Sequence, residues 1–335
     1  MKTIYEKLTY KRTVEILHPI IKTAYNLKNV KKLINRFPIK SGMKTRWVND
    51  PIPELKTALK DWNEEVTEVY EKALDREGLT LFSQAYLPGK SIKTNAKIHQ
   101  HSTKIIKFDF SGFYDSVSFD YIKDDIRHLT DGSDHELELI KRLIIDPKTG
   151  GVTQGLPMSG ALAGLALIPF WKELKQTLDK NIMFTQYSDD LTFSLNQSKE
   201  TPRFNIEYLS LKINQALKNS NRDFDLNEEK TTVQERQFRK ITGVRINHNN
   251  QLSCSRKDYR LLRTVAHVLS KESETEPVLK QFGFKSKESF TGKISYMRSI
   301  DETGKIDKLI DKYANVFLQH NLFKSWIVEK LSVFA

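Results

Sequence analysis

The stretch "QYSDDLTF", residues 186–193, constrains this chain more than any other feature. It sets Asp189 beside Asp190 between apolar, β-branched and aromatic residues, which are typical of strands. The longer segment 181–195 predicts two strands joined by a tight turn at Ser188, that is, a hairpin. Adjacent carboxylates repel each other, so a cation bound at the hairpin tip would explain why both are present. An ordinary surface turn, which Asp favours, is the alternative.

A second predicted strand offers a third carboxylate. The segment "KIIKFDF", residues 104–110, is aromatic and β-branched, and strand alternation places Asp109 on the face opposite Phe108 and Phe110. Magnesium prefers oxygen ligands, and two ions about 3.5–4 Å apart can clamp an in-line phosphoryl transfer. If this strand lies beside the hairpin, the three carboxylates therefore predict a two-metal site in which the ions neutralise the repulsion.

The charge distribution points in the same direction. The 335 residues include 54 Lys and Arg against 42 Asp and Glu, which gives a net charge of +12. By our count the net charge is +8 over 1–100 (19 basic, 11 acidic), −4 over 101–200 (11 and 15) and +8 over 201–335 (24 and 16). Basic arms around an acidic centre suit an enzyme that grips nucleic-acid phosphates and gathers carboxylates for metal. A cytosolic protein with a solvated basic surface is the alternative.

Other features bear on location. The single cysteine, Cys254, excludes an internal disulfide and a cysteine-based zinc cluster, and it fits a reducing compartment. Residues 1–20 carry charges throughout, so no signal peptide is expected. The longest apolar stretch, 161–171, is too short to cross a bilayer. We therefore expect a cytoplasmic protein without membrane contact.

Hydrophobic spacing and turn residues predict the remaining elements. Helices are expected over 1–40 (with breaks at Pro19 and Pro38), 54–76, 119–145 (with a loop at 130–134), 159–178 and 204–219, and the chain from Ser255 onwards is expected to be mainly helical. Short strands are expected near 231–234 and 238–246. Linkers are expected at 270–277 and around Gly243.

The order of the motifs points to a family. "FDFSGFYDSV", "TQGLPMSGALAGL", "YSDD" and "LNEEKT" resemble, in this order, the palm motifs of reverse transcriptases. "NAKIH" (95–99) and "KITGVRI" (240–246) resemble two elements of bacterial retron reverse transcriptases. The flanks "KTRWVNDPIPELKTALKDW", "SRKDYRLLRTVAHVL" and "GKISYMRSID" are also similar to those of retron enzymes, so the resemblance covers about residues 40 to 320.

Three positions depart from the family pattern. Ser188 stands where the third motif commonly has Ala, and Ile241 stands where the Val-Thr-Gly element has Val. Gly160 follows Ser159 where the family usually has Pro at the start of the palm helix. Gly begins a helix less well than Pro, which puts the start of this helix in doubt but leaves the carboxylates untouched.

The resemblance implies an α+β right-hand polymerase fold, in which the palm has an antiparallel sheet with packed helices and the thumb is mainly helical. The domains would be a basic helical N-terminal extension at 1–40, fingers at 41–100 with parts of 131–155, a palm at 101–245 and a thumb at 246–335.

The resemblance also implies roles at the active site. Asp109, Asp189 and Asp190, with the backbone carbonyl of Phe110, would hold two Mg²⁺ ions, for which Mn²⁺ could substitute. Tyr114 would be a steric gate that excludes ribonucleotides; an ordinary core tyrosine is the alternative.

Further residues would bind the nucleotide. Gln154 and Gly155 would lie against the nascent base pair, unless they form a plain loop. Lys44 and Arg46 would grip the triphosphate, and Lys230 would approach the pyrophosphate; solvated surface cations are the alternative.

The resemblance extends to RNA and DNA contacts. Asn95 and His99 would do structural or RNA-contacting work rather than catalysis, and Thr242 and Gly243 belong to the second retron element. Basic residues at helical spacing in the thumb would track an RNA–DNA duplex, or else form a solvated face: Arg256, Lys257, Arg260 and Arg263.

The resemblance as a whole implies a retron reverse transcriptase. Such an enzyme copies its own structured non-coding RNA, from deoxynucleoside triphosphates and an RNA 2′-hydroxyl primer, into branched multicopy single-stranded DNA (msDNA). Anti-phage defence, a separate effector protein and a host RNase H would follow. The rivals are an abortive-infection or group II intron-like reverse transcriptase, which should differ in the "NAKIH" and "ITG" elements or carry a further domain, and a non-catalytic RNA-binding scaffold, against which the three carboxylates speak.

Overall fold

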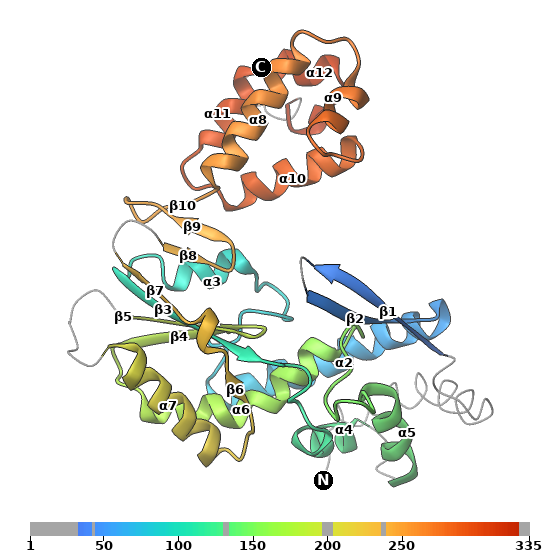
Figure 1. The fold of residues 1–335 in the computed structure, drawn as a ribbon, viewed down its shortest axis with the longest axis vertical. Coiled ribbons are helices and arrows are strands. Elements are labelled where there is room, and N and C mark those ends of the chain that lie inside the picture. The colour runs from blue at the N-terminus through green and yellow to red at the C-terminus, as the bar shows by residue number, and fades with distance from the viewer. Residues whose placement is uncertain (1–32, 42–43, 130–133, 196–203, 236–238, 328–335) are drawn as a thin grey trace. The chain divides into compact units, whose positions relative to one another are not determined.

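The computed structural model describes residues 33–41, 44–129, 134–195, 204–235 and 239–327. The chain divides into two compact units. The first comprises residues 1–91 and 105–233, and the second comprises residues 92–104 and 234–335. Figure 1 shows a mixed sheet-and-helix first unit and a mainly helical second unit with a small sheet.

A five-stranded sheet organises the first unit. Its order is β4 (Ile182–Tyr187), β5 (Asp190–Leu195), β3 (Lys104–Ser111) and β6 (Asp225–Leu226), which pair antiparallel, and β7 (Thr232–Glu235) also pairs with β3. The two strands expected within 181–195 are confirmed, and so is the hairpin that they form, because β4 and β5 pair up to Tyr187 and Asp190. The strand at 104–110 lies directly beside the hairpin, with Asp109 opposite Asp190.

Helices cover the sheet on one side (Figure 1). The helix α6 (Ser159–Thr177) packs against β3 and β4: Phe170 meets Phe110 edge to face, and Trp171 Nε1 donates to Gln186 Oε1 at 2.6 Å. The expected helix at 54–76 is confirmed as α2 (Pro53–Glu77), which ends at Gly78 in the left-handed conformation. The close crossing of α2 and α6 needs Gly164, because a Cβ there would lie 2.3 Å from the Tyr70 ring.

The remaining helices of the first unit also match their predicted places. These are the 3₁₀ turn η2 (Phe119–Tyr121), α4 (Lys123–His128), α5 (Asp134–Ile144) and α7 (Ile206–Asn219). A further 3₁₀ turn, η3 (Glu228–Lys230), lies where no helix was predicted.

The helix predicted over 1–40 is wrong for its last residues. A two-stranded antiparallel ribbon forms instead, from β1 (Ile34–Ser41) and β2 (Lys44–Pro51), with Pro38 opposite Trp47. Pro38 lacks a backbone donor, which a ribbon with free edges tolerates and a helix interior does not. Residues 1–32 of that prediction lie outside the described residues.

The second unit joins a small sheet to a helical core. The strands β8 (Arg239–Ile241), β9 (Val244–Ile246) and β10 (Leu252–Ser253) form the sheet, and α3 (Ile92–Ile98) packs on it. The helices α8 (Arg256–Leu269), α9 (Thr275–Gln281), α10 (Lys287–Ile300), α11 (Lys305–Lys312) and α12 (Ala314–Gln319) enclose a separate apolar core. The predicted helix from Ser255 is confirmed, with the Ser255 side chain accepting from Asp258 N.

Both predicted linkers are wrong. Gly243 lies in the two-residue turn between β8 and β9, where Thr242 has φ +44° and Gly243 has φ +90°. Positive φ at both positions is the pattern of a tight hairpin turn, so the element is a sheet corner rather than a linker. The segment 270–277 does not join two units, because it connects α8 to α9 within the second unit and α9 starts inside it at Thr275.

In the described part of the chain, no helix is both long and apolar enough to cross a membrane.

Candidate active site

The three carboxylates of the sequence motifs lie together at one end of the first unit's sheet. Asp109 in β3 is opposite Asp190 in β5, and Phe110 N donates to the Asp189 carbonyl at 2.9 Å. Asp109 is only 5% exposed although it bears a charge. The positive φ of Ser188, +57°, makes the sharp turn that sets Asp189 at the hairpin tip. The apolar strands thus bring acidic groups from distant parts of the sequence to one edge.

Two lysines already lie among these carboxylates. Lys230 Nζ contacts Asp109 Oδ1 at 2.6 Å, and Lys107 Nζ contacts Asp190 Oδ1 at 3.4 Å. The hydrogen bond to Asp109 raises the pKa of Lys230 above its ordinary value. Lys230 was expected near a pyrophosphate; in this structure its ammonium group lies on a carboxylate.

Asp189 has a different environment. Burial, followed by the charge of Asp109, raises the pKa of the Asp189 carboxyl. Burial and a neighbouring carboxylate both disfavour the ionised form of a carboxyl group. A cation near Asp189 would stabilise that form.

The donors suit a hard divalent ion, although the site is not arranged as a finished one. Within the described residues, no three carboxylate, imidazole or thiol groups stand as a complete ligand set. At the same place, Lys230 contacts an oxygen of Asp109 and Lys107 contacts an oxygen of Asp190. Carboxylate oxygens are the ligands that Mg²⁺ prefers, and the two ammonium groups occupy positions that a cation would take. The residues therefore fit magnesium, provided that the lysines release the carboxylates.

The backbone of Phe110 also faces this edge. Its N–H points to the hairpin, where it donates to Asp189, and the N–H and C=O of a strand residue point to the same side. The Phe110 carbonyl is therefore directed to the hairpin side of β3, as its predicted role requires.

Tyr114 lies beside the hairpin tip, in the loop after β3. Its hydroxyl is 2.7 Å from the Tyr86 hydroxyl, which in turn donates to Ser188 Oγ at 2.8 Å. Burial, and then Tyr86, raise the pKa of Tyr114, so its hydroxyl stays protonated. Phe113 instead lies in the core, where it stacks on Phe110.

The predicted nucleotide-binding loop lies against β2. The Gln154 carbonyl accepts from Asn49 N at 3.3 Å and from Asn49 Nδ2 at 3.0 Å. Gly155 has φ +104°, and a Cβ there would lie 2.6 Å from the Asn49 carbonyl. The glycine is thus required for close backbone approach, and the Gln154 side chain is left exposed. Lys44 and Arg46 lie in β2, but their side chains lie outside the described part of the structure.

The two short retron-like elements meet in the second unit. Asn95 Nδ2 in α3 is 3.5 Å from Thr242 Oγ1 in the β8–β9 turn, and Gly243 follows at the exposed corner. Asn95 and His99 are both fully buried, and burial lowers the pKa of His99 to about 3, so the imidazole is neutral. Burial fits the structural role for these two side chains better than direct contact with RNA.

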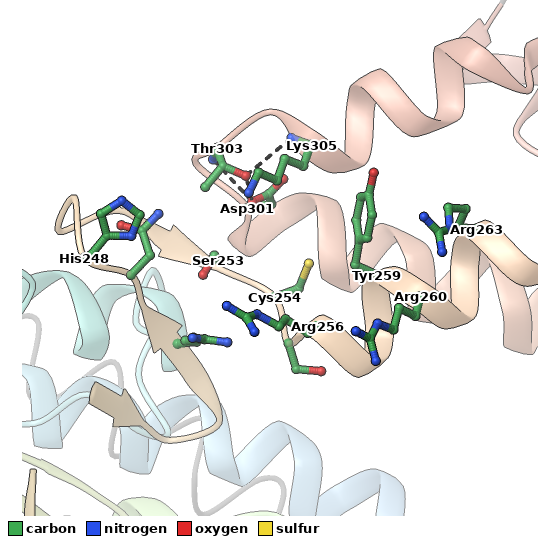
Figure 2. A pocket seen from close by; sticks show the side chains of 13 residues that line it. His248, Ser253, Cys254, Arg256, Tyr259, Arg260, Arg263, Asp301, Thr303 and Lys305 are labelled. Carbon is green, nitrogen blue, oxygen red and sulfur yellow. Dashed lines mark hydrogen bonds between the residues drawn. The ribbon is translucent and has the colours of Figure 1, made fainter. Parts of the chain in front are cut away.

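The second unit also contains a pocket of about 530 Å³ (Figure 2). It lies between the β9–β10 hairpin, the first turns of α8 and the loop before α11, with Tyr259 among its lining residues. Five cationic side chains line it: Arg245, Arg256, Arg260, Arg263 and Lys305. Three of the four predicted nucleic-acid contacts on α8 therefore share one pocket, while the exposed Lys257 does not line it.

The pocket keeps its positive charge. Its only acidic lining residue is Asp301, whose carboxylate accepts hydrogen bonds from Thr303 N, Thr303 Oγ1 and Ile306 N at 2.6–3.2 Å. Among the described residues, no carboxylate lies within 4 Å of the side-chain nitrogens of Arg256, Arg260, Arg263 or Lys305. Such a pocket can bind an anion of the size of a nucleotide.

Sequence reasoning missed several of these residues. Strand alternation predicts that Lys107 lies on the same face as Asp109, but no role was predicted for it. Tyr86 and Asn49 carry no local signal, since their roles depend on contacts with residues about 100 positions away. Arg245 and Lys305 join the pocket only through the fold of the second unit.

Comparison with known proteins identifies the family. Residues 51–246 match the family model described as reverse transcriptase (RNA-dependent DNA polymerase). The chain belongs to the reverse transcriptase family. The α+β right-hand fold expected from the sequence is thereby confirmed, with the antiparallel sheet and packed helices of the first unit and the mainly helical second unit.

The resemblance to retron enzymes is also confirmed. This reverse transcriptase is 27% identical over 211 residues to the Retron Ec83 reverse transcriptase of Escherichia coli, a match that covers 58% of this chain and 67% of that protein. It is 28% identical to the Retron Mx65 reverse transcriptase of Myxococcus xanthus over 61% of this chain and 52% of the relative. The Retron Mx162 enzyme of the same organism matches at 26% identity over 63% of this chain and 46% of the relative. The matches thus span about half the length of the Myxococcus relatives.

Among solved structures, telomerase of Candida albicans with a fragment of telomeric RNA matches with a TM-score of 0.46 and 14% identity, over 86% of this chain and 58% of that one. Apo telomerase of Candida tropicalis matches with a TM-score of 0.45 and 13% identity, over 90% of this chain and 64% of that one.

Proposed function

We propose that this protein is a retron reverse transcriptase that extends a DNA strand on an RNA template from deoxynucleoside triphosphates. The observation that carries the proposal is that Asp109, Asp189 and Asp190 meet at one edge of the sheet. Lys230 contacts Asp109 there, and Lys107 contacts Asp190. A scaffold that only bound RNA would have no use for crowded, partly buried carboxylates, which cost free energy unless a cation compensates them.

Asp109, Asp189, Asp190 and the Phe110 carbonyl would hold two divalent ions. When bound, Mg²⁺ or Mn²⁺ would lower the pKa of the primer hydroxyl and neutralise the triphosphate and the leaving pyrophosphate. The chain itself would orient the reactants, since phosphoryl transfer depends mostly on positioning and charge. Lys230, on leaving Asp109, would remain within reach of the leaving group.

The fingers, palm and thumb would contribute separate contacts. Tyr114 would exclude the 2′-hydroxyl of a ribonucleotide, while Gln154 and Gly155 would lie against the new base pair. Lys44 and Arg46 in β2 would bind the triphosphate. Contacts with RNA and DNA would come from the β8–β9 turn at Thr242 and Gly243 and from α8, where Arg256, Arg260 and Arg263 would bind phosphates in the pocket of the second unit and Lys257 would bind on the open helix face.

The retron assignment rests on the "NAKIH" and "ITG" elements, whose residues Asn95 and Thr242 are neighbours. The template would be a cognate structured non-coding RNA, primed from its own 2′-hydroxyl, and the product branched msDNA. The protein would act in the cytoplasm, in defence against phage, with a separate effector protein and with a host RNase H to remove template.

Primer extension on an RNA template tests the polymerase. With Mg²⁺ and deoxynucleotides, Asp109→Asn and Asp190→Asn should each lower the rate at least about 1,000-fold, because an amide cannot supply the anionic ligand. Asp120→Asn removes an exposed carboxylate of the same unit and is the matched control. Retention of full synthesis by both active-site variants would favour the scaffold.

Sequencing the nucleic acid that co-purifies with the wild-type protein tests the retron assignment. A hybrid in which DNA is joined to an RNA 2′-hydroxyl is expected. Bulk cellular RNA alone would favour an abortive-infection or intron-type enzyme.

A further inference from the structure

Tyr86 lies at the centre of a hydroxyl network beside the hairpin tip. Its hydroxyl is 2.7 Å from that of Tyr114 and donates to Ser188 Oγ at 2.8 Å. Tyr114 follows β3, and Ser188 directly precedes Asp189. The network therefore joins the ring proposed as the steric gate to the turn that carries two of the three carboxylates.

Tyr86 is held in this position at some cost. Its φ is +62°, which is an uncommon conformation for a residue with a bulky side chain. Its side chain is 46% exposed, so core packing does not account for its place. A strained conformation persists only where the surrounding contacts fix it, and such residues cluster at functional sites.

The surroundings of Tyr86 explain two departures from the family pattern. A Cβ on Gly160 would lie 2.3 Å from Tyr86 Cγ and Cδ1, so any other residue there, including the usual Pro, would displace the ring. Ser188, in place of the common Ala, supplies the oxygen that accepts from the Tyr86 hydroxyl. Both positions of this chain are thus fitted to one tyrosine, although they belong to different motifs of the sequence.

We infer that Tyr86 is a positioning residue that fixes the Tyr114 ring relative to the carboxylates, and that it thereby sets the discrimination between deoxyribonucleotides and ribonucleotides. This inference rests on the proposed function, since it assumes that Tyr114 is the gate. A gate ring excludes a 2′-hydroxyl only while it cannot tilt. A hydrogen bond at the tip of the ring, far from its Cβ, restrains that tilt most effectively.

The test measures the ratio of kcat/KM for a deoxynucleotide to kcat/KM for the matching ribonucleotide in primer extension. Tyr86→Phe keeps the ring and removes the hydroxyl together with its hydrogen bonds to Tyr114 and Ser188, and it should lower this ratio roughly three- to tenfold. Ser188→Ala, which keeps the hydrogen bond between Tyr86 and Tyr114, should lower it about twofold. A general structural defect would reduce both rates and leave the ratio unchanged.

A double variant shows whether Tyr86 acts on the ratio through Tyr114. Tyr114→Phe should also lower the ratio, and the double variant should lower it no further than Tyr86→Phe alone, because the two single variants share the loss of the hydrogen bond between the two hydroxyls. Tyr208→Phe, which removes a tyrosine hydroxyl from α7, is the matched control and should leave the ratio unchanged.

Tyr114→Val tests the steric-gate role of Tyr114 separately from the positioning role of Tyr86. If Tyr114→Val leaves the ratio unchanged, Tyr114 is no gate and the inference falls with that role. If Tyr114→Val lowers the ratio while Tyr86→Phe and Ser188→Ala do not, only the positioning role of Tyr86 is overturned.

Discussion

The carboxylate site of the first unit and the basic pocket of the second unit both crowd like charges, but they balance them in different ways. At the carboxylate site, the chain supplies its own cations, because Lys230 contacts Asp109 and Lys107 contacts Asp190. In the pocket, four cations have no carboxylate neighbour among the described residues, and the single lining carboxylate, Asp301, is occupied by local hydrogen bonds.

This difference indicates which ligand each region can bind. At the carboxylate site, Lys230 and Lys107 offset part of the negative charge, and in the proposed function divalent ions would take their place. The four cations of the pocket have no carboxylate neighbour among the described residues, so an anion from outside would relieve their repulsion, and we propose a nucleic-acid phosphate as that anion. Mutations can change the charge balance of the carboxylate site and that of the basic pocket separately.

The largest change in RNA affinity should come from the pocket. Replacing Arg256, Arg260 and Arg263 together by Gln should weaken binding of a structured RNA about 100-fold near 0.1 M salt. The slope of log affinity against log salt should become shallower by roughly 2 to 3, about one for each phosphate that is no longer neutralised. Filter binding over a salt series measures both quantities.

Lys271, Lys280 and Lys308 provide the matched control, since they are exposed cations of the same unit outside the pocket. Their replacement by Gln changes the net charge equally and should weaken binding only severalfold. Equal losses of affinity in the two triple variants would mean that net charge, rather than the pocket, binds the RNA.

A smaller effect is expected at Asp189. Its pKa is raised by burial and then by Asp109, so the folded protein binds this proton more tightly than the unfolded chain does. The stability linked to this group is therefore full below the ordinary pKa of 3.8 and is lost as the pH rises through the raised pKa. Asp189→Asn removes the penalty, so at pH 7.5 without metal it should raise Tm by about 2 °C or more.

The pH and metal dependence of this gain checks its cause. The gain should shrink as the pH falls towards 4, because the raised pKa lets the wild-type carboxyl take up its proton. It should also shrink on addition of Mg²⁺, which stabilises the wild type alone. Thermal unfolding at the two pH values, with and without Mg²⁺, measures this. A lower Tm for Asp189→Asn without metal at pH 7.5 would contradict it.

Much of this architecture could be predicted because it is encoded locally. The hairpin at 181–195 and the strand at 104–110 combine alternation with turn residues, and the helix at 54–76 has Pro at its start and Gly after its end. The meeting of Asp109 with the hairpin pair needed more than local pattern, and it was available from the order of the family motifs.

What escaped prediction depends on distant contacts. The lysine on Asp109 lies 121 residues away in sequence, and the pocket is assembled from three separate segments. Ile34–Ser41 forms a strand against helical spacing because Lys44–Pro51 offers a partner, and pairing outweighs weak propensity. The burial of His99 likewise could not be read from a polar residue in a short motif.

The smallest effect concerns Cys254, which lines the pocket and is the only cysteine in the chain. Burial, with Asp301 nearby, raises the pKa of its thiol to about 11, so at pH 8 only about one thiol in a thousand is ionised. Alkylation by iodoacetamide should therefore be slow and should speed up about tenfold per pH unit.

Bound RNA should slow the alkylation of Cys254 a further few-fold, because RNA in the pocket shields the sulfur. Mass spectrometry of the modified peptide over time measures the rate, and the Arg256, Arg260 and Arg263 triple variant should lose the protection. If RNA binds tightly to the wild type yet leaves the alkylation rate unchanged, its phosphates lie elsewhere, and the uncompensated cations of the pocket must have another anion as their ligand.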